Sequence, residues 1–122
     1  EFQFEVPSPE LKLNVDRTQI EQILINLLKN AREACSRKSD KKIQVKARKL
    51  SAGNTTLTIS DNGEGILPDV LDKIFVPFFT TKTSGSGIGL SLCKQIMTLH
   101  EGSINVKSEV GKGSSFILTF PK

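Results

Sequence analysis

The stretch that most constrains the fold is a long amphipathic segment that begins at Asp16. Asp is a preferred residue at the N-cap of a helix, and Gln19 three positions later completes a capping-box pattern. From Ile20 onward apolar residues recur at helical spacing on one face, which predicts a helix that runs to about Ser36. The apolar positions are Ile20, Ile23, Leu24, Leu27, Leu28, Ala31 and Ala34. A helix with one apolar face needs a second layer to pack against.

Alternating strands follow this helix in pairs. Residues 43–50 and 55–60 alternate apolar and polar side chains and are joined by Ser-Ala-Gly-Asn, which predicts a hairpin. Residues 104–108 and 116–120 form a second pair around the glycine turn 111–115. Paired strands with short connections argue against a parallel sheet built from βαβ units.

The remaining segments complete a two-layer pattern. Strands are expected at 2–6 and 11–15, a short helix at 69–73, and a second long apolar-periodic helix at 88–100. We therefore predict an α/β (α+β) two-layer sandwich, with a mixed, mostly antiparallel sheet of about five strands and about three helices on one face. In such a layout a ligand would lie between the helix layer and the loops.

Composition indicates one globular domain over residues 1–122, with 37% hydrophobic and 25% charged residues. The chain starts at Glu1 without an initiator Met, so we expect it to be excised from a larger protein. It contains no apolar run near the roughly 20 residues of a membrane helix, and we expect no membrane contact by this domain. The parent protein could still be membrane-anchored.

Charge and cysteine usage narrow the function classes. The net charge of +4 comes from 17 basic and 13 acidic residues, and the chain has no Trp or Tyr. Nucleic-acid binding would need a longer basic stripe with interleaved aromatic residues, so we expect none. Cys35 and Cys93 lie among apolar residues of the predicted helices and are expected to be buried reduced thiols in a cytoplasmic domain.

Two asparagines border the apolar face of the first helix. Asn26 and Asn30 are one turn apart, Glu33 follows on the same flank, and Lys29 is one step away. Asn is a poor helix former because its amide competes for backbone groups. The two amides are either exposed at the surface or present their oxygens to a ligand or metal, and carbonyl oxygens suit Mg²⁺.

Glycine clusters follow a strand end and precede a helix. Asp61 ends the second strand of the first hairpin and is followed by Gly63 and Gly65, which form either a simple turn or a site where a flat ring approaches the backbone. Residues 80–90 carry three alternating glycines behind Lys82, so they form either a Gly/Ser linker or an anion site at a helix N-terminus. Neither cluster has the spacing of a Walker loop or of a dinucleotide-binding fingerprint.

Five motifs in order carry a family resemblance. They are residues 26–34 (Asn-Leu-Leu-Lys-Asn-Ala-Arg-Glu-Ala), 61–66 (Asp-Asn-Gly-Glu-Gly-Ile), 75–82 (Phe-Val-Pro-Phe-Phe-Thr-Thr-Lys), 85–90 (Gly-Ser-Gly-Ile-Gly-Leu) and 111–116 (Gly-Lys-Gly-Ser-Ser-Phe). They resemble the N box, first glycine box, F box, second glycine box and third glycine box of the ATP-binding catalytic domain of sensor histidine kinases. That family shares the Bergerat fold with DNA gyrase, heat-shock chaperone ATPases and MutL. The Pro-Phe-Phe-Thr-Thr-Lys form is most similar to kinases of the nitrogen-regulatory type.

The resemblance implies how phosphates and metal are held. Asn30 would coordinate Mg²⁺ on the triphosphate, and Asn26 would support it from one turn away. Lys82 and the backbone amides of 85–90 would hold the phosphates. Residues 67–84 would form the mobile ATP lid.

The resemblance also assigns the base. Asp61 would accept the adenine amino group and disfavour guanine, Gly63 and Gly65 would admit the ring, and Ile66 and Leu90 would be its apolar walls. The other residues expected at ATP are Lys29, Glu33, Phe79, Thr80, Thr81, Gly85, Ser86, Gly87, Ile88, Gly89, and Ser114 and Ser115, either of whose hydroxyls could help bind adenine.

Two functions are open on this resemblance. In the first, the domain binds Mg-ATP and passes the γ-phosphoryl group to a histidine on a separate dimerisation domain of the same parent protein, with a response regulator downstream. Asn26 and Lys82 would be its catalytic residues. In the second, it is an ATP-hydrolysing switch of the gyrase or MutL type, but those members carry Glu where this chain has Asn26, and an amide cannot act as the base. The first is favoured, without autophosphorylation of this fragment alone.

Overall fold

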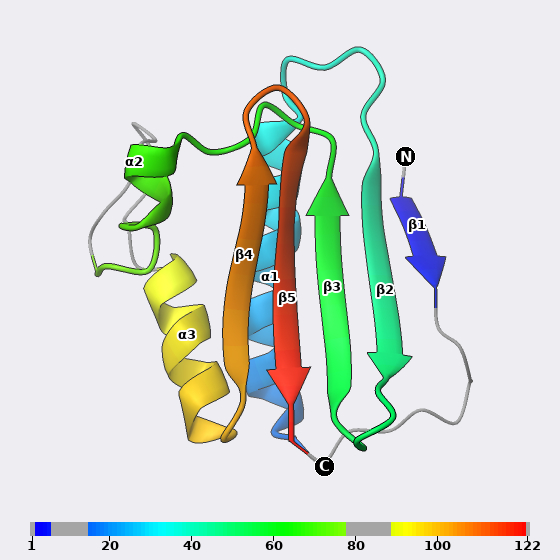
Figure 1. Ribbon diagram of the computed structural model, residues 1–122, viewed down its shortest axis with the longest axis vertical. Coiled ribbons are helices and arrows are strands. Elements are labelled where there is room, and N and C mark those ends of the chain that lie inside the picture. Colours follow the sequence, from blue (N-terminus) through cyan, green and yellow to red (C-terminus); the bar gives the residue numbers. More distant parts are fainter. Residues whose placement is uncertain (1, 6–14, 78–88, 122) are drawn as a thin grey trace.

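The computed structural model describes residues 2–5, 15–77 and 89–121, and of 2–5 only the backbone. Eight elements follow one another along the chain (Figure 1). They are β1 (Phe2–Glu5), α1 (Arg17–Ala34), β2 (Ile43–Lys49), β3 (Thr55–Asp61), α2 (Pro68–Leu71), α3 (Gly89–Leu99), β4 (Ser103–Glu109) and β5 (Gly113–Phe120). Within these ranges no helix is long and apolar enough to cross a bilayer.

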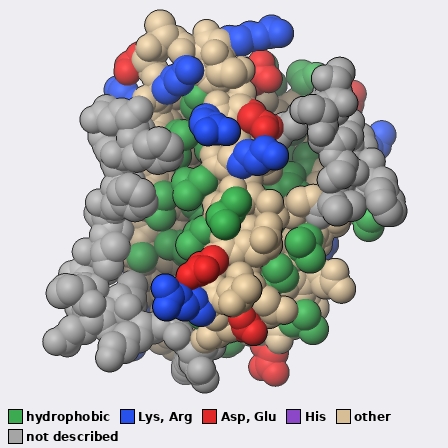
Figure 2. All heavy atoms as spheres, turned by 180° about the vertical axis from the view of Figure 1, so that it is seen from behind, with side chains coloured by type: hydrophobic (Ala, Val, Ile, Leu, Met, Phe, Trp, Pro, Cys, Tyr) green, Lys and Arg blue, Asp and Glu red, His purple; other side chains and the backbone are tan. Residues whose placement is uncertain are grey.

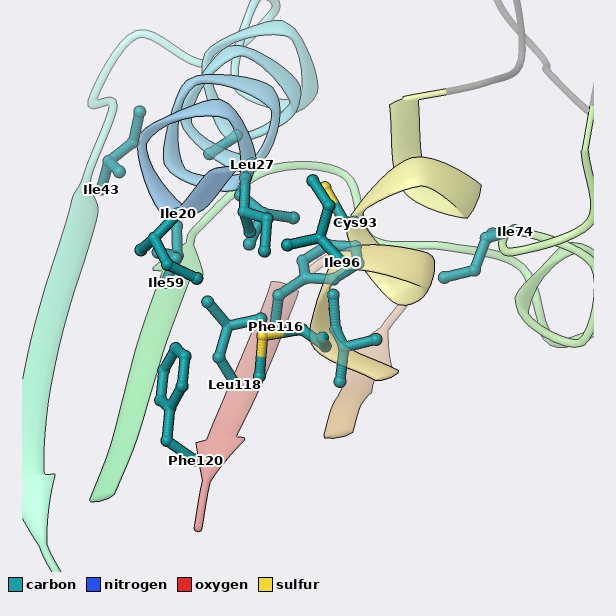
Figure 3. Close-up of a cluster of buried hydrophobic side chains, with 14 of the residues drawn as sticks. Ile20, Leu27, Ile43, Ile59, Ile74, Cys93, Ile96, Phe116, Leu118 and Phe120 are labelled. Atoms are coloured by element: carbon teal, nitrogen blue, oxygen red, sulfur yellow. The ribbon is translucent and has the colours of Figure 1, made fainter. Parts of the chain in front are cut away.

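The strands form one five-stranded sheet in the order β1-β2-β3-β5-β4. Strands β2 to β5 pair antiparallel with their neighbours, and β1 is added parallel to β2 at the edge. Helices α1 and α3 lie side by side on one face of this sheet (Figures 1 and 3). This confirms the predicted two-layer sandwich with a mixed, mostly antiparallel sheet.

Local sequence explains where α1 begins and ends. The Asp16 carboxylate accepts a hydrogen bond from the Gln19 backbone N–H at 3.1 Å, as its position at the N-cap predicts. After Ala34 the chain leaves the helix through Cys35, whose N–H still bonds the Ala31 carbonyl. The predicted helix is therefore confirmed within two residues at its C-terminal end.

The core lies between the helix layer and the sheet (Figure 3). Helix α1 contributes the face that its periodicity predicts, and α3 contributes Cys93, Ile96 and Met97. The sheet faces them with alternate residues of its strands, among which Ile59, Leu118 and Phe120 are nearly inaccessible to solvent. Some large hydrophobic side chains stay exposed on the helices, namely Ile25, Leu92 and Leu99. Figure 2 views the side of the sheet that the helices cover and shows hydrophobic side chains at its surface.

The second hairpin differs from the sequence prediction. Strand β5 begins at Gly113, because β4 and β5 stay in register up to the Glu109–Gly113 pair. Ser114 and Ser115 therefore belong to a strand and not to the glycine turn. The short helix α2 is confirmed, but it begins one residue and ends two residues earlier than expected. Most of the strand expected at 11–15 lies outside the described residues.

One side chain ties the end of α3 to the beginning of α1. The His100 Nε2 accepts the Asp16 backbone N–H at 3.0 Å, and its Nδ1 lies 2.9 Å from the Ile96 carbonyl oxygen. A carbonyl oxygen only accepts, so Nδ1 carries the proton and the imidazole is neutral in this arrangement. The only histidine of the sequence thus has a structural role.

Candidate functional site

Asn26 connects the two long helices. Its Nδ2 donates to the Gly89 carbonyl oxygen at 3.4 Å and lies 3.8 Å from the Cys93 Sγ. Its Oδ1 accepts from the Gln22 Nε2 at 3.4 Å, one turn earlier on α1. The structure therefore places the Asn26 side chain beside Gly89, the first residue of α3.

The other polar residues of α1 continue along the same flank. Asn30 and Glu33 are half-buried, and Lys29 is exposed. The Glu33 Oε2 is shielded from solvent. Residues three apart on a helix share a face, so the Asn30 amide and the Glu33 carboxylate offer oxygen atoms to one region.

Asp61 ends β3 beside the C-terminal end of α1. Its Oδ1 accepts the Gly63 backbone N–H at 2.8 Å, and the Ser114 backbone N–H also bonds the carboxylate. Burial raises the pKa of Asp61 above its ordinary value of 3.8, and these two hydrogen bonds offset part of that shift. Asp61 is half-buried and keeps partial exposure to solvent.

The glycines after Asp61 are required by the fold itself. A Cβ on Gly63 would lie 2.5 Å from the Ala34 carbonyl oxygen, so the turn packs directly on the end of α1. Gly65 has φ +79, and a Cβ there would lie 2.4 Å from the Glu109 carbonyl oxygen. Any larger residue at either position would push the turn off its neighbours. This requirement exists without a ligand and agrees with the simple-turn alternative, but the packing against Ala34 and Glu109 was not predicted.

Ser114 and Ser115 lie on opposite faces of the sheet. Ser114 is opposite Asp61 in the register and is buried on the helix side, whereas Ser115 is opposite Ser60. The Ser60 and Ser115 Oγ atoms are 2.8 Å apart on the other face. The expectation that either hydroxyl contacts the base therefore narrows to Ser114, because Asp61 is on its face.

Sequence reasoning missed Ser108 of β4. Its Oγ accepts the Ile66 backbone N–H at 2.8 Å and lies 3.1 Å from the Gly113 carbonyl oxygen and 2.8 Å from the Ser114 Oγ. The available signal was alternation, since Ile104 and Val106 face the core and position 108 continues that face. An open hollow of about 340 Å³ lies at this end of the sheet; its lining includes Asp61, Lys107, Ser108, Ser114 and Ser115.

Both cysteines are buried free thiols. The Cys35 Sγ lies 3.5 Å from the Asn62 Oδ1, and its pKa is raised by burial and by the nearby Asp61 charge. Burial raises the pKa of Cys93 to about 11, against the opposing hydrogen bond from Asn26. Both side chains are therefore protonated at neutral pH and serve as small core residues.

The apolar residues at the border of the site are anchored in the core. Ile66 and Leu90 are half-buried and pack against it, as does Phe75, whose ring lies 5.7 Å from the Lys94 Nζ. The expected site residues Phe79, Thr80, Thr81, Lys82, Gly85, Ser86, Gly87 and Ile88 lie outside the described residues.

Comparison with known proteins identifies the family. Residues 15–122 match the family described as histidine kinase-, DNA gyrase B-, and HSP90-like ATPase. The chain belongs to this family. The resemblance drawn from the five motifs is thus confirmed, and the family is one of ATPases.

Individual relatives are sensor kinases. The sensor histidine kinase ZraS of Salmonella typhimurium is 39% identical over 110 residues, which cover 90% of this chain and 23% of ZraS. The catalytic domain of histidine kinase ThkA has a TM-score of 0.87 at 36% identity, over 100% of this chain and 80% of that one. The chain spans about a fifth to a quarter of the length of the curated relatives it matches.

Two further solved structures include binding partners. Full-length ShkA in complex with AMPPNP has a TM-score of 0.84 at 27% identity, over 99% of this chain and 25% of that one. ThkA in complex with the response regulator protein TrrA has a TM-score of 0.79 at 32% identity, over 100% of this chain and 34% of that one.

Proposed function

We propose that this domain binds Mg-ATP and donates the γ-phosphoryl group to a histidine on a separate dimerisation domain of its parent protein. The observation that carries the proposal is the amide of Asn26 at the junction of α1 and α3. An amide whose N–H bonds the Gly89 carbonyl has no means to take a proton from water. Transfer to a protein acceptor is therefore favoured over the hydrolysis of a gyrase-type or MutL-type switch.

The residues of α1 fit a magnesium ion held mainly by the nucleotide. Asn30 and Glu33 offer oxygen atoms from one flank of the helix. Within the described residues no group of three or more His, Cys, Asp and Glu side chains could form a protein cage for a metal. This donor set suits Mg²⁺, which keeps several waters and bridges phosphates. Bound there, the ion would neutralise charge on the phosphates, with Asn30 as its protein ligand.

The base would be held at the end of β3. The ionised Asp61 carboxylate is an acceptor for the adenine amino group, and guanine presents a carbonyl oxygen at that edge, which a carboxylate repels. Ser114 lies beside it on the same face. Ile66 and Leu90 border the region with apolar surface.

The proposed phosphoryl transfer rests on positioning and charge neutralisation. Lys82, within an ATP lid at 67–84, would supply a cation, and the glycines that precede Leu90 would supply backbone amides. Asn26 links the α1 flank, which also carries Asn30, to the first residue of α3. We also propose a response regulator as the downstream partner and the cytoplasm as the location of this domain.

The acceptor is outside this chain. The only histidine, His100, uses both ring nitrogens in structural contacts. Phosphorylation of either nitrogen would break the contact of α3 with Asp16 or with its own last turn. We therefore expect no stable phosphorylation of this domain by itself.

The experiment mixes this domain with a separately produced dimerisation domain of its parent protein and γ-³²P-ATP. Label is expected on the dimerisation domain, absent from this chain, and reduced in Asn26→Ala and Asn30→Ala variants that keep the native circular dichroism spectrum. Release of inorganic phosphate at the same rate with and without the acceptor, and no labelled protein, would establish the hydrolase alternative.

A further inference from the structure

Ser108 occupies a position where the strand pattern calls for an apolar residue. It follows Ile104 and Val106 on the core side of β4, and it is opposite Ser114 in the register with β5. A hydroxyl on that side is costly unless it is hydrogen-bonded. Ser108 has three partners within 3.1 Å: the Ile66 N–H, the Gly113 carbonyl and the Ser114 hydroxyl.

The single proton of Ser108 fixes the direction of this network. A serine hydroxyl donates one hydrogen bond and accepts two. The Ile66 N–H can only donate, so it takes one lone pair, and the Gly113 carbonyl can only accept, so it takes the Ser108 proton. The remaining contact is then satisfied when the Ser114 hydroxyl donates to Ser108. In this arrangement all three contacts are made and the Ser114 proton is directed away from Asp61.

The network joins the two segments that border Asp61. Ile66 belongs to the turn that follows Asp61, and Ser114 lies beside Asp61 on β5. With its proton committed to Ser108, the Ser114 oxygen keeps only acceptor capacity toward the space in front of Asp61. Two neighbouring acceptors favour a base edge that carries an amino group over one that carries a carbonyl.

We propose that Ser108 is a positioning residue that sets the adenine preference of the site, by holding the Ile66 turn and by orienting the Ser114 hydroxyl as an acceptor. Ser108 itself does not touch the nucleotide. The inference rests on the proposed ATP site and deepens it. Without Ser108 the Ser114 hydroxyl is free to rotate and to donate to a guanine carbonyl.

The test compares the affinities for ATP and GTP of wild type, Ser108→Ala and Ser108→Thr by calorimetry. We expect Ser108→Ala to lower the ratio of ATP to GTP affinity about tenfold, the loss of one oriented hydrogen bond. Ser108→Thr keeps the hydroxyl and is expected to restore the ratio. The matched control is Ser60→Ala, which removes a serine pair of equal length on the opposite face and should leave the ratio within about twofold.

A coupling measurement separates orientation from general loosening. If Ser108 acts through Ser114, Ser114→Ala lowers the ratio by itself, and adding Ser108→Ala changes it little more. Independent, additive effects of the two substitutions, or a ratio in Ser108→Ala equal to that of wild type, would overturn the inference. A wild-type domain that binds no adenine nucleotide would instead overturn the proposed function. Thermal unfolding of each variant shows that the folded protein is measured.

Discussion

The close packing of Gly63 against the end of α1 predicts that Gly63→Ala destabilises the fold. A methyl group at Gly63 would lie 2.5 Å from the Ala34 carbonyl oxygen and 2.8 Å from the Ala34 Cβ. The backbone of Gly63 is outside the left-handed region, so Gly63→Ala adds this overlap and no backbone strain. The neighbouring atoms belong to the last turn of a helix and cannot rotate away, so either the turn or the helix end has to move.

The expected cost follows from that movement. Overpacking of this kind costs about 1–3 kcal/mol. Moving the turn also lengthens the 2.8 Å hydrogen bond from Gly63 N–H to Asp61, which contributes about 1 kcal/mol. We therefore expect Gly63→Ala to lower the free energy of unfolding by about 3 kcal/mol.

Urea denaturation followed by circular dichroism, without nucleotide, measures this change if the m-value stays constant. The control is Gly111→Ala, because Gly111 has φ +85 and nothing within 4 Å of the added methyl group, so only backbone strain is introduced. That strain should cost about 1 kcal/mol. The reasoning is refuted if Gly63→Ala unfolds within about 0.5 kcal/mol of wild type, or if Gly111→Ala costs more.

Three further predictions concern ionisation, thiol access and a helix end. Because burial raises the pKa of Asp61 above 3.8, ionisation of Asp61 opposes folding. The stability of Asp61→Asn relative to wild type should therefore rise as the pH increases from below 3.8 through the native pKa. Urea titrations across that range would contradict this if the difference in stability stayed constant. Cys35 and Cys93 should resist Ellman's reagent at pH 8 in the folded protein and react fully in urea. The reason is that both thiols are buried and burial raises the pKa of Cys93 to about 11. Rapid labelling of the native protein would show that the core opens. Glu101 follows the end of α3 with φ 59, a conformation that glycine adopts without strain. Glu101→Gly should therefore raise the free energy of unfolding by up to about 1 kcal/mol. A loss of stability in the same urea assay would argue against strain at this residue.

The regular elements were predictable because each has a local cause. Asp16 caps α1 with its own carboxylate, and the apolar face from Ile20 onward leaves one orientation for the helix. The hairpin of β2 and β3 follows from alternation around a glycine loop. These signals depend on neighbours in sequence, so one chain is sufficient to find them.

Features that depend on contacts distant in sequence were not predictable in this way. The start of β5 is set by the pairing of Gly113 with Glu109 and of Ser114 with Asp61. The local sequence Gly-Lys-Gly-Ser-Ser gives no sign of either pair. Ser108 looked like an ordinary polar residue until the register brought Ile66 and Ser114 within hydrogen-bond distance. The need for glycine at position 63 was also not predictable, because the residue that a side chain there would overlap, Ala34, belongs to another element.

The hydrogen bond from Asn26 to Gly89 has a consequence for how such domains diverge. The chemical group that would turn a phosphoryl donor into a hydrolase is a carboxylate at position 26, and a carboxylate can only accept hydrogen bonds. It would meet the Gly89 carbonyl with two acceptors facing each other, so the same substitution that introduces a base would also remove this hydrogen bond between α1 and α3. In the proposed phosphoryl donor, a substitution at position 26 therefore changes the chemistry of the site and the contact between the two helices at the same time.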